Sequence, residues 1–312
     1  MSSEIFKKIL DPFCRKPLLR TPSSKLRTGL VARRDLLRWL LGVPFLTFFP
    51  LPVRLSHAEA SSPLKTSGER SIGQFFKGEE LFYEVGVWLF KRAALGRLTF
   101  KEGGEKGLYI ATLQAETLGV LGWVSRHRVD TYRATMEEVE GRRRFRALSF
   151  EEDVKIGSKK RRNSHTFDHQ RRKWIKGRQR KDGTMTWTEE EIPPGMVYDD
   201  FLTASYNFRY GVYGAIERGR NYLVSTFPRK GASHYEVKVA TKEEEQKKRS
   251  ELKQKGGKEF FVKLYLDPEV THSKEGLIEG WLSKEAYPVE GMIRDVVFFG
   301  DVKGTLVKNT KG

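Results

Sequence analysis

The sequence predicts a mainly β protein: an antiparallel curved sheet that forms a half-barrel or barrel-like domain with one short central helix. Two observations favour this fold class. Runs of alternating apolar and polar residues recur from about residue 75 onward, separated by Gly, Pro, Asn or Asp. Helices of similar length do not alternate with these runs, which argues against a parallel α/β fold.

We expect about a dozen strands. They cover residues 81–87, 96–101, 109–116, 129–136, 145–151, 173–176, 184–188, 222–227, 235–239, 260–266, 277–282, 289–298 and 302–307. In the run over residues 109–116 the odd positions are mostly apolar and the even positions are mostly polar. Such a strand buries one face and leaves the other in water, as is common in antiparallel sheets.

The central helix is expected from Asp199 to about Arg209, with Asp199 or Asp200 as its N-cap. We expect its apolar stripe to plug one mouth of the curved sheet. Arg209 could pair with either aspartate across the helix, and spacing alone does not decide between them. Residues 242–258 are almost entirely charged or polar, which predicts a long solvated hairpin loop or a loose helical excursion.

The composition bounds the class of partner. The 312 residues are 38% hydrophobic and 31% charged, which is typical of a globular chain large enough to bury a core. The formal charge of +18 favours anionic partners or a strongly solvated surface. Cys14 is the single cysteine, which excludes an internal disulfide and cysteine-based zinc or iron–sulfur sites.

An export signal is predicted at the N-terminus. A basic stretch containing Arg33 and Arg34 precedes an apolar run over residues 39–53, and a motif with Ala58 and Ala60 follows it. This order predicts a signal cleaved after Ala60, and the paired arginines followed by two leucines resemble the twin-arginine motif. The alternatives are an ordinary secretion signal and an uncleaved anchor, although a membrane span needs about 20 apolar residues.

These features predict the domain organisation. The signal segment covers residues 1–60, and its long n-region indicates a true translation start near Leu30 or Val31. Residues 61–74 are expected to be a mobile leader, and residues 75–312 a single β domain. After cleavage the chain has no cysteine, which suits an oxidising compartment and predicts a periplasmic, envelope-associated protein without a transmembrane span.

Recognisable catalytic motifs are absent from the sequence, including the Gly-x-Ser-x-Gly elbow and the phosphate-binding Gly-rich loop. His165 and His169 are the best metal candidates, but on a strand their side chains would lie about 13 Å apart. Adjacent carboxylates mostly mark turns and caps. We therefore predict a protein that is not an enzyme and holds no metal or cofactor. A hydrolase whose site cannot be read from the sequence is the remaining alternative.

The informative charge lies in residues 142–181, which hold sixteen basic and four acidic side chains. Their net +12 exceeds the +11 of residues 61–312 as a whole. Successive hairpins would stack the basic runs into one patch able to bind anionic lipid, lipopolysaccharide or acidic glycan, with an idle solvated face as the alternative. Nucleic acid is not expected in an exported protein. The candidate binding residues are Lys159, Lys160, Arg161, Arg162, Arg171, Arg172, Lys173, Trp174 and Lys176.

Three segments carry a family resemblance: residues 78–85, residues 197–209, and the group Gly280-Trp281-Leu282-Ser283 with its continuation to Leu306. They resemble the opening strand, central helix and closing hairpin of the bacterial exported proteins grouped as domain of unknown function 3108. The resemblance implies a periplasmic, mainly antiparallel domain, like the curved half-barrels of envelope lipoprotein carriers. It implies no established activity and no catalytic residue. The basic block and residues 242–258 depart from the family's pattern.

Together these observations predict binding or assembly in the cell envelope. The first hypothesis is an apolar or lipid-like ligand, or an envelope component such as a lipoprotein, held on the concave face of the sheet. The alternative is a polyanion bound by the basic face. An open apolar cavity would favour the first, and a filled core with one basic face would favour the second.

Processing provides the first test. We expect the mature chain to begin at Ser61, because Ala58 and Ala60 supply the small residues that signal peptidase needs. N-terminal sequencing of the exported protein checks this. The double change Arg33→Lys and Arg34→Lys should stop export through the twin-arginine pathway, and unimpaired export of that variant would remove the pathway assignment.

Overall fold

The computed structural model describes residues 70–87, 90–229, 232–252, 258–266, 273–296 and 300–310. All of them belong to one compact unit, residues 61–312. The predicted signal segment, with Arg33, Arg34, Ala58 and Ala60, lies outside the described residues. None of the described helices is both long and apolar enough to cross a membrane.

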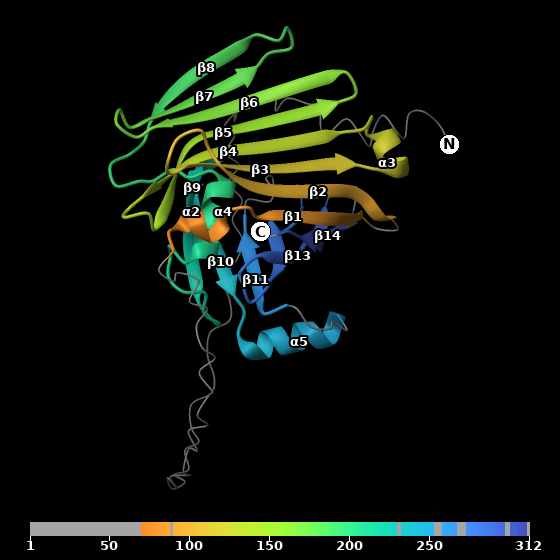
Figure 1. Cartoon of the computed structure of the whole chain (residues 1–312). Helices are drawn as coiled ribbons and strands as arrows, with labels where there is room; N and C mark the ends of the chain where they lie inside the picture. Colours follow the sequence, from red (N-terminus) through yellow and green to blue (C-terminus); the bar gives the residue numbers. More distant parts are fainter. Residues whose placement is uncertain are drawn as a thin grey trace, which may run out of the picture. The chain divides into compact units, whose positions relative to one another are not determined.

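The described residues contain fourteen strands in one antiparallel sheet that curves round a central helix (Figure 1). The strands are β1 (Glu80–Val87), β2 (Phe90–Glu102), β3 (Leu108–Thr117), β4 (Val129–Val139), β5 (Arg144–Ile156), β6 (Lys159–Asp168), β7 (Lys173–Gln179), β8 (Met185–Glu191), β9 (Asn221–Arg229), β10 (Ala232–Val239), β11 (Phe260–Tyr265), β12 (Leu277–Leu282), β13 (Pro288–Val296) and β14 (Gly300–Asn309). Their order is β8-β7-β6-β5-β4-β3-β2-β1-β14-β13-β12-β11-β10-β9. The predicted fold class is confirmed.

Each predicted strand corresponds to an observed one, but β6 was not among the predicted runs. Its first half, Lys159 to Arg162, consists of four exposed cations, and its buried Phe167 comes near its end. An apolar alternation is therefore missing from the part of β6 that extends beyond the core. Pairing with β5 and β7 places this segment in the sheet.

Four helices accompany the sheet in the described part of the chain: α2 (Ile72–Phe76), α3 (Gly119–Val124), α4 (Phe201–Tyr210) and α5 (Lys242–Leu252). The folded domain begins earlier than residue 75, because α2 starts at the fully buried Ile72. Ser71 caps α2 by accepting from the amide of Gln74, and the Gly73 amide donates to Glu138 Oε1 at 2.9 Å. The last three residues of the predicted mobile leader are thus helical, and Ile72 and Gly73 are buried.

The predicted central helix is confirmed as α4, which contacts β4, β5 and β9. Asp200 is its N-cap, with one carboxylate oxygen accepting from the amides of Leu202 and Thr203 at 2.8 and 3.0 Å. Gly211 ends the helix at φ 91°, a left-handed conformation that glycine adopts without a Cβ penalty.

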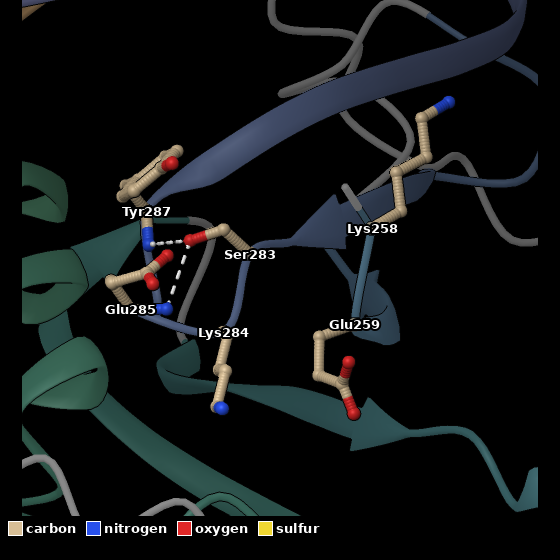
Figure 2. Close-up of a pocket in the computed structure, with 6 residues that line it drawn as sticks. All are labelled: Lys258, Glu259, Ser283, Lys284, Glu285 and Tyr287. Carbon is tan, nitrogen blue, oxygen red and sulfur yellow. Dashed lines mark hydrogen bonds between the residues drawn. The ribbon is translucent and has the colours of Figure 1, made fainter. Parts of the chain in front are cut away.

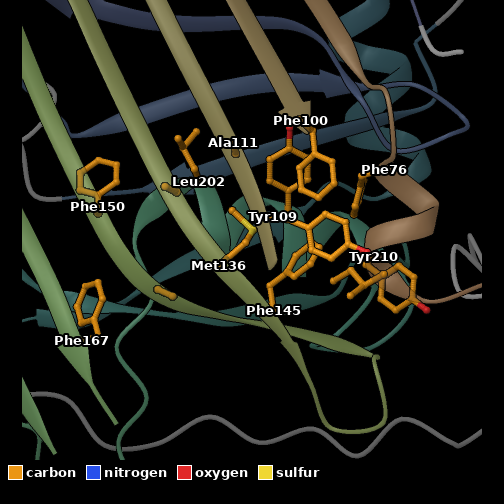
Figure 3. Close-up of a cluster of buried hydrophobic side chains, with 14 of the residues drawn as sticks. Phe76, Phe100, Tyr109, Ala111, Met136, Phe145, Phe150, Phe167, Leu202 and Tyr210 are labelled. Atoms are coloured by element: carbon orange, nitrogen blue, oxygen red, sulfur yellow. The ribbon is translucent and has the colours of Figure 1, made fainter. Parts of the chain in front are cut away.

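Buried aromatic side chains of the sheet and of α4 pack together in one cluster (Figure 3). The ring centroid of Phe100 lies 5.3 Å from that of Tyr109, 5.6 Å from that of Phe145 and 4.8 Å from that of Tyr206. These side chains are almost completely buried. Since each large aromatic side chain buries about 150–250 Å², this cluster supplies much of the hydrophobic stabilisation of the domain.

A buried ion pair ties α4 to the sheet. Arg209 donates to both carboxylate oxygens of Glu79, at 2.9 and 2.5 Å, and its Nε donates to the Ala286 carbonyl at 2.8 Å. Both charged side chains are only 2% exposed. The expected pairing of Arg209 with Asp199 or Asp200 is therefore wrong, because Asp200 caps the helix and Asp199 pairs with Arg144 at 3.0 Å.

Of the two alternatives for residues 242–258, the structure has the helical one over residues 242–252. The first eleven residues of this segment form α5, and Arg249 lies over the Trp281 ring at 4.5 Å from the centroid. The Lys248 ammonium donates to Glu279 of β12 at 2.8 and 2.9 Å. The long apolar stems of these cations cover aromatic side chains of the sheet, which explains how so polar a helix packs.

The buried ion pair makes a quantitative prediction for stability. Arg209→Met should lower the free energy of unfolding by about 3–5 kcal/mol in urea titrations, because it leaves the Glu79 carboxylate buried and unpaired. The double variant Glu79→Leu, Arg209→Met should recover much of that loss, since neither charge then remains.

The exposed neighbouring pair provides the control. Arg97→Gln breaks a contact with Glu80 that is open to solvent, so it should cost less than about 1 kcal/mol. Equal losses in Arg209→Met and Arg97→Gln would contradict the role given to the buried pair.

Candidate functional site

Glycines form a row across three neighbouring strands of the sheet. Gly304 of β14 pairs with Gly291 of β13, which pairs with Gly280 of β12. Directly paired residues share a face, and Gly280 pairs in turn with Val262, a member of the core. The glycine row therefore lies on the concave face of the sheet.

The concave face is open at Gly291 and Gly304, whereas a Cβ atom on Gly280 would lie 3.2 Å from the Glu290 carbonyl oxygen. A Cβ atom built on Gly291 or on Gly304 would meet no heavy atom within 4 Å. Neither glycine has a positive φ, so neither is required by the backbone. Glycine inside a strand weakens the sheet and often marks a place where a ligand or another backbone comes close.

An apolar row runs parallel to the glycine row, two residues further along each strand. Successive pairings join Val87, Val302, Ile293, Ile278 and Leu264 across β1, β14, β13, β12 and β11. All five side chains are half-buried, so each keeps part of its apolar surface in water. Together the two rows form a partly exposed apolar strip on the concave face, which we call the glycine groove.

The concave face is thus divided. The half near α4 is filled by the aromatic cluster, whereas the half that carries the glycine groove keeps exposed apolar surface. Tyr83 lies at the division, and its hydroxyl donates to the Pro288 carbonyl at 2.9 Å. Burial raises the pKa of Tyr83 well above its usual value, so the hydroxyl stays neutral.

The basic block does not form one patch. β6 runs antiparallel to both neighbours, so Lys159 to Arg162 lie at its start and Arg171 to Lys173 follow its end. Six to nine residue steps of about 3.3 Å along β6 separate the two groups by about 20–30 Å. The predicted stacking of these runs by successive hairpins is therefore wrong.

The four cations at the start of β6, Lys159 to Arg162, are all exposed. Arg162 forms a bidentate ion pair with Asp153, with hydrogen bonds of 2.7 and 3.1 Å. Lys159, Lys160 and Arg161 make no ion pair with any other described residue, and we call them the basic tip. Lys160 is paired across the strands with Lys155, a like-charge juxtaposition that destabilises the sheet unless an anion relieves it.

Cations at the other end of β6 are neutralised by β8. Glu189 lies 3.4 Å from Lys173 and 3.7 Å from Arg171, and Glu190 pairs with Lys176. Arg172 donates to the Ile192 carbonyl. These contacts hold the edge strand β8 against β7, so a structural role accounts for these cations.

Trp174, which was expected to interleave with the basic residues, is 4% exposed. Its ring stands perpendicular to Tyr198 with centroids 5.7 Å apart, and its Nε1 donates to His165 Nδ1 at 3.2 Å. The second histidine of the candidate metal pair, His169, places its Nε2 2.6 Å from the Ala147 carbonyl. Trp174, His165 and His169 thus make packing and hydrogen-bond contacts within the fold.

Charged side chains line two surface hollows of the described residues. One, of about 240 Å³, lies beside the turn between β12 and β13 (Figure 2). There the Ser283 hydroxyl accepts from the amides of Glu285 and Tyr287, so it stabilises a turn. The other, of about 360 Å³, adjoins Glu279 and Arg294, which pair at 3.0 Å. Neither offers an apolar wall or a nucleophile beside a base.

Buried carboxylates at the start of α4 have raised pKa values. Burial raises the pKa of Asp199 to about 6, opposed by Arg144, and that of Asp200 to about 7, opposed by hydrogen bonds from Thr203. Asn207 Nδ2 also donates to Asp199 at 3.2 Å, and the Ala147 amide donates at 3.3 Å. Every partner comes from α4 or β5, so these carboxylates fasten the helix to the sheet. Groups of three or more His, Cys, Asp or Glu able to hold a metal do not occur among the described residues.

Sequence reasoning missed the glycine groove. Its glycines are separated by ten or more residues along the chain, and each alone is typical of a turn or bulge. Strand register brings them together. The three residues of the basic tip were among the predicted site residues. Only the pairing of strands β5 to β8 shows that they lie apart from Arg171 and Lys173, which Glu189 neutralises.

Comparison with known proteins completes the description. A family model described as "Protein of unknown function (DUF3108)" matches residues 83–307. A solved structure, the beta-barrel-like protein of domain of unknown function DUF1849 from Brucella abortus, is 13% identical, with a TM-score of 0.41 over 75% of this chain and 97% of that chain. No curated protein matches this chain.

Proposed function

Because this chain belongs to the DUF3108 family of proteins of unknown function, we propose its function from its own surface: it binds an apolar, lipid-like molecule in the glycine groove. The observation that carries the proposal is the row Gly304, Gly291 and Gly280 beside half-buried aliphatic side chains. Ligand sites are typically concave and mostly apolar, and this is the part of the concave face with both properties.

The length of the apolar row favours a chain-like ligand. The apolar row crosses five strands, so its ends lie about 19 Å apart at about 4.8 Å per strand. Glycine at the floor lets an acyl chain approach the backbone, and the neighbouring aliphatic side chains contact its methylene groups. Each buried methylene contributes about 0.8 kcal/mol. The lining is aliphatic and offers no nucleophile or general base, so the proposed role is binding and not catalysis.

The proposed place of action is the periplasm, in contact with the cell envelope. Support comes from the order of basic, apolar and small residues over residues 1–60, which is that of a cleaved export signal. A lipid carrier or an assembly factor for an envelope component, including a lipoprotein, would meet its apolar ligand there.

A second candidate function is binding of an anionic envelope component, such as anionic lipid, lipopolysaccharide or acidic glycan, through the basic tip. The observation that favours it is the absence of an ion pair at Lys159, Lys160 and Arg161 among the described residues, together with the Lys155 and Lys160 pairing. Near an anionic membrane each such cation contributes about 1 kcal/mol.

The groove is tested by filling it. In the double variant Gly291→Val, Gly304→Val, valine suits a strand, but two side chains occupy the open floor. We expect lipid retained by protein purified from its own envelope to fall about tenfold by mass spectrometry, which corresponds to about 1.4 kcal/mol of binding.

Gly104→Val is the matched control. A Cβ atom at Gly104 would also meet no heavy atom within 4 Å, but Gly104 lies in the turn between β2 and β3, away from the glycine groove. It should retain lipid as the native protein does. Unchanged lipid in the groove variant, or no lipid in the native protein, would contradict the first proposal.

The basic tip is tested separately. Lys159→Gln, Lys160→Gln should weaken co-sedimentation with anionic liposomes, most strongly at low salt, because the Debye length shrinks from about 10 Å at 0.1 M to about 3 Å at 1 M. Folding should be retained, since exposed charges contribute little to stability. The control Arg171→Gln, Lys173→Gln removes two cations that Glu189 neutralises, so it should change binding less. Equal effects of the two variants would argue against the basic tip.

A further inference from the structure

The short helix α3 presents apolar side chains to water. Trp123 is 75% exposed and Val120 is 62% exposed, although both belong to a six-residue helix between β3 and β4. Exposing an indole ring in this way is unfavourable unless another surface covers it. Figure 1 shows α3 at one end of the long strands β3 and β4, away from the end that carries α2.

Trp123 cannot turn inward, because α3 is seated closely on the sheet. Gly122 is the buried residue of α3, and a Cβ there would lie 2.8 Å from the Thr117 carbonyl oxygen. The amide of Leu118 donates to the Ala93 carbonyl of β2 at 2.8 Å. These contacts fix which side of the helix faces outward.

The turn after α3 is held in a strained conformation. Arg126 and His127 have φ values of 56° and 52°, in the left-handed region that non-glycine residues rarely adopt. The amide of His127 donates to the Gly122 carbonyl at 2.6 Å, and the amide of Arg126 donates to the Trp123 carbonyl at 3.1 Å. Such strain persists only where surrounding bonds enforce it, and it occurs often at functional sites.

This turn is joined to the basic tip. The amide of Gly157, in the turn between β5 and β6, donates to the Arg126 carbonyl at 2.8 Å. Lys159 and Lys160 follow two and three residues after Gly157, and Arg126 is itself exposed. The exposed Trp123 and the exposed lysines of the basic tip therefore belong to two neighbouring segments that a hydrogen bond joins.

We propose that α3 and the basic tip form a docking surface for an anionic phospholipid bilayer. Trp123 and Val120 enter the interfacial layer, while Arg126, Lys159 and Lys160 contact lipid phosphates. Tryptophan favours the membrane interface, and cations beside it add electrostatic attraction. The charged part rests on the second candidate function, whereas the apolar part is independent of it.

Charge argues against a second copy of the chain as the occupant. Two copies meeting through α3 would bring their basic tips together, and like charges repel at such an interface. A bilayer rich in anionic lipid offers the opposite sign together with an apolar layer at the depth of an indole ring.

Vesicle flotation of the purified full chain after signal processing tests the proposal. We expect the native protein to float with phosphatidylcholine vesicles that contain phosphatidylglycerol, and to retain part of this binding at about 1 M salt, where charges are screened. Trp123→Ser should lower the partition coefficient about tenfold at both salt concentrations, because it removes the inserted ring. Lys159→Gln, Lys160→Gln should weaken binding mainly at low salt.

Trp187→Ser is the matched control, because Trp187 is also an exposed tryptophan, at 55%, but belongs to the edge strand β8 near Glu189. It should float as the native protein does. Equal binding of Trp123→Ser and the native protein would overturn the insertion of α3, even if the lysine variant confirms the basic tip. Sedimentation velocity showing a dimer that Trp123→Ser dissolves would overturn it in favour of a second copy.

Discussion

The position of α4 depends on the ion pair between Arg209 and Glu79. It joins the end of the helix to the residue before β1, and the same guanidinium holds the Ala286 carbonyl in the turn between β12 and β13. Each charge is costly to bury alone, so the arrangement is stable only when all three segments meet. The position of α4 in turn decides which half of the concave face is filled by aromatic side chains and which half stays open.

This division separates stability from function within one sheet. The aromatic cluster beneath α4 is almost completely buried, whereas three adjacent strands carry paired glycines that bury no side chain. Glycine inside a strand costs up to about 1 kcal/mol relative to alanine. The proposed lipid-like ligand would approach the backbone at this row and contact its aliphatic lining.

Charge follows the same division. At the core end of β6, acidic side chains of β8 neutralise the cations and fasten the sheet edge. At the opposite end, Lys159, Lys160 and Arg161 have no described ion-pair partner and lie near the exposed Trp123 of α3. A protein that exchanges an apolar ligand with a membrane needs both an apolar groove and a surface that approaches the bilayer. The proposed groove and docking surface meet these two needs through separate residues.

The sequence by itself determined the antiparallel class, thirteen strands and the capped helix α4, because alternation and capping are local properties of neighbouring residues. It did not reveal β6, whose start is four cations, since a strand without apolar alternation is recognised only by its neighbours. Tertiary structure alone decided that Arg209 pairs with Glu79, 130 residues away, that the basic block divides into two ends, and that three glycines share one row. Each of these depends on strand register, which brings distant residues together and leaves no local periodicity in the chain.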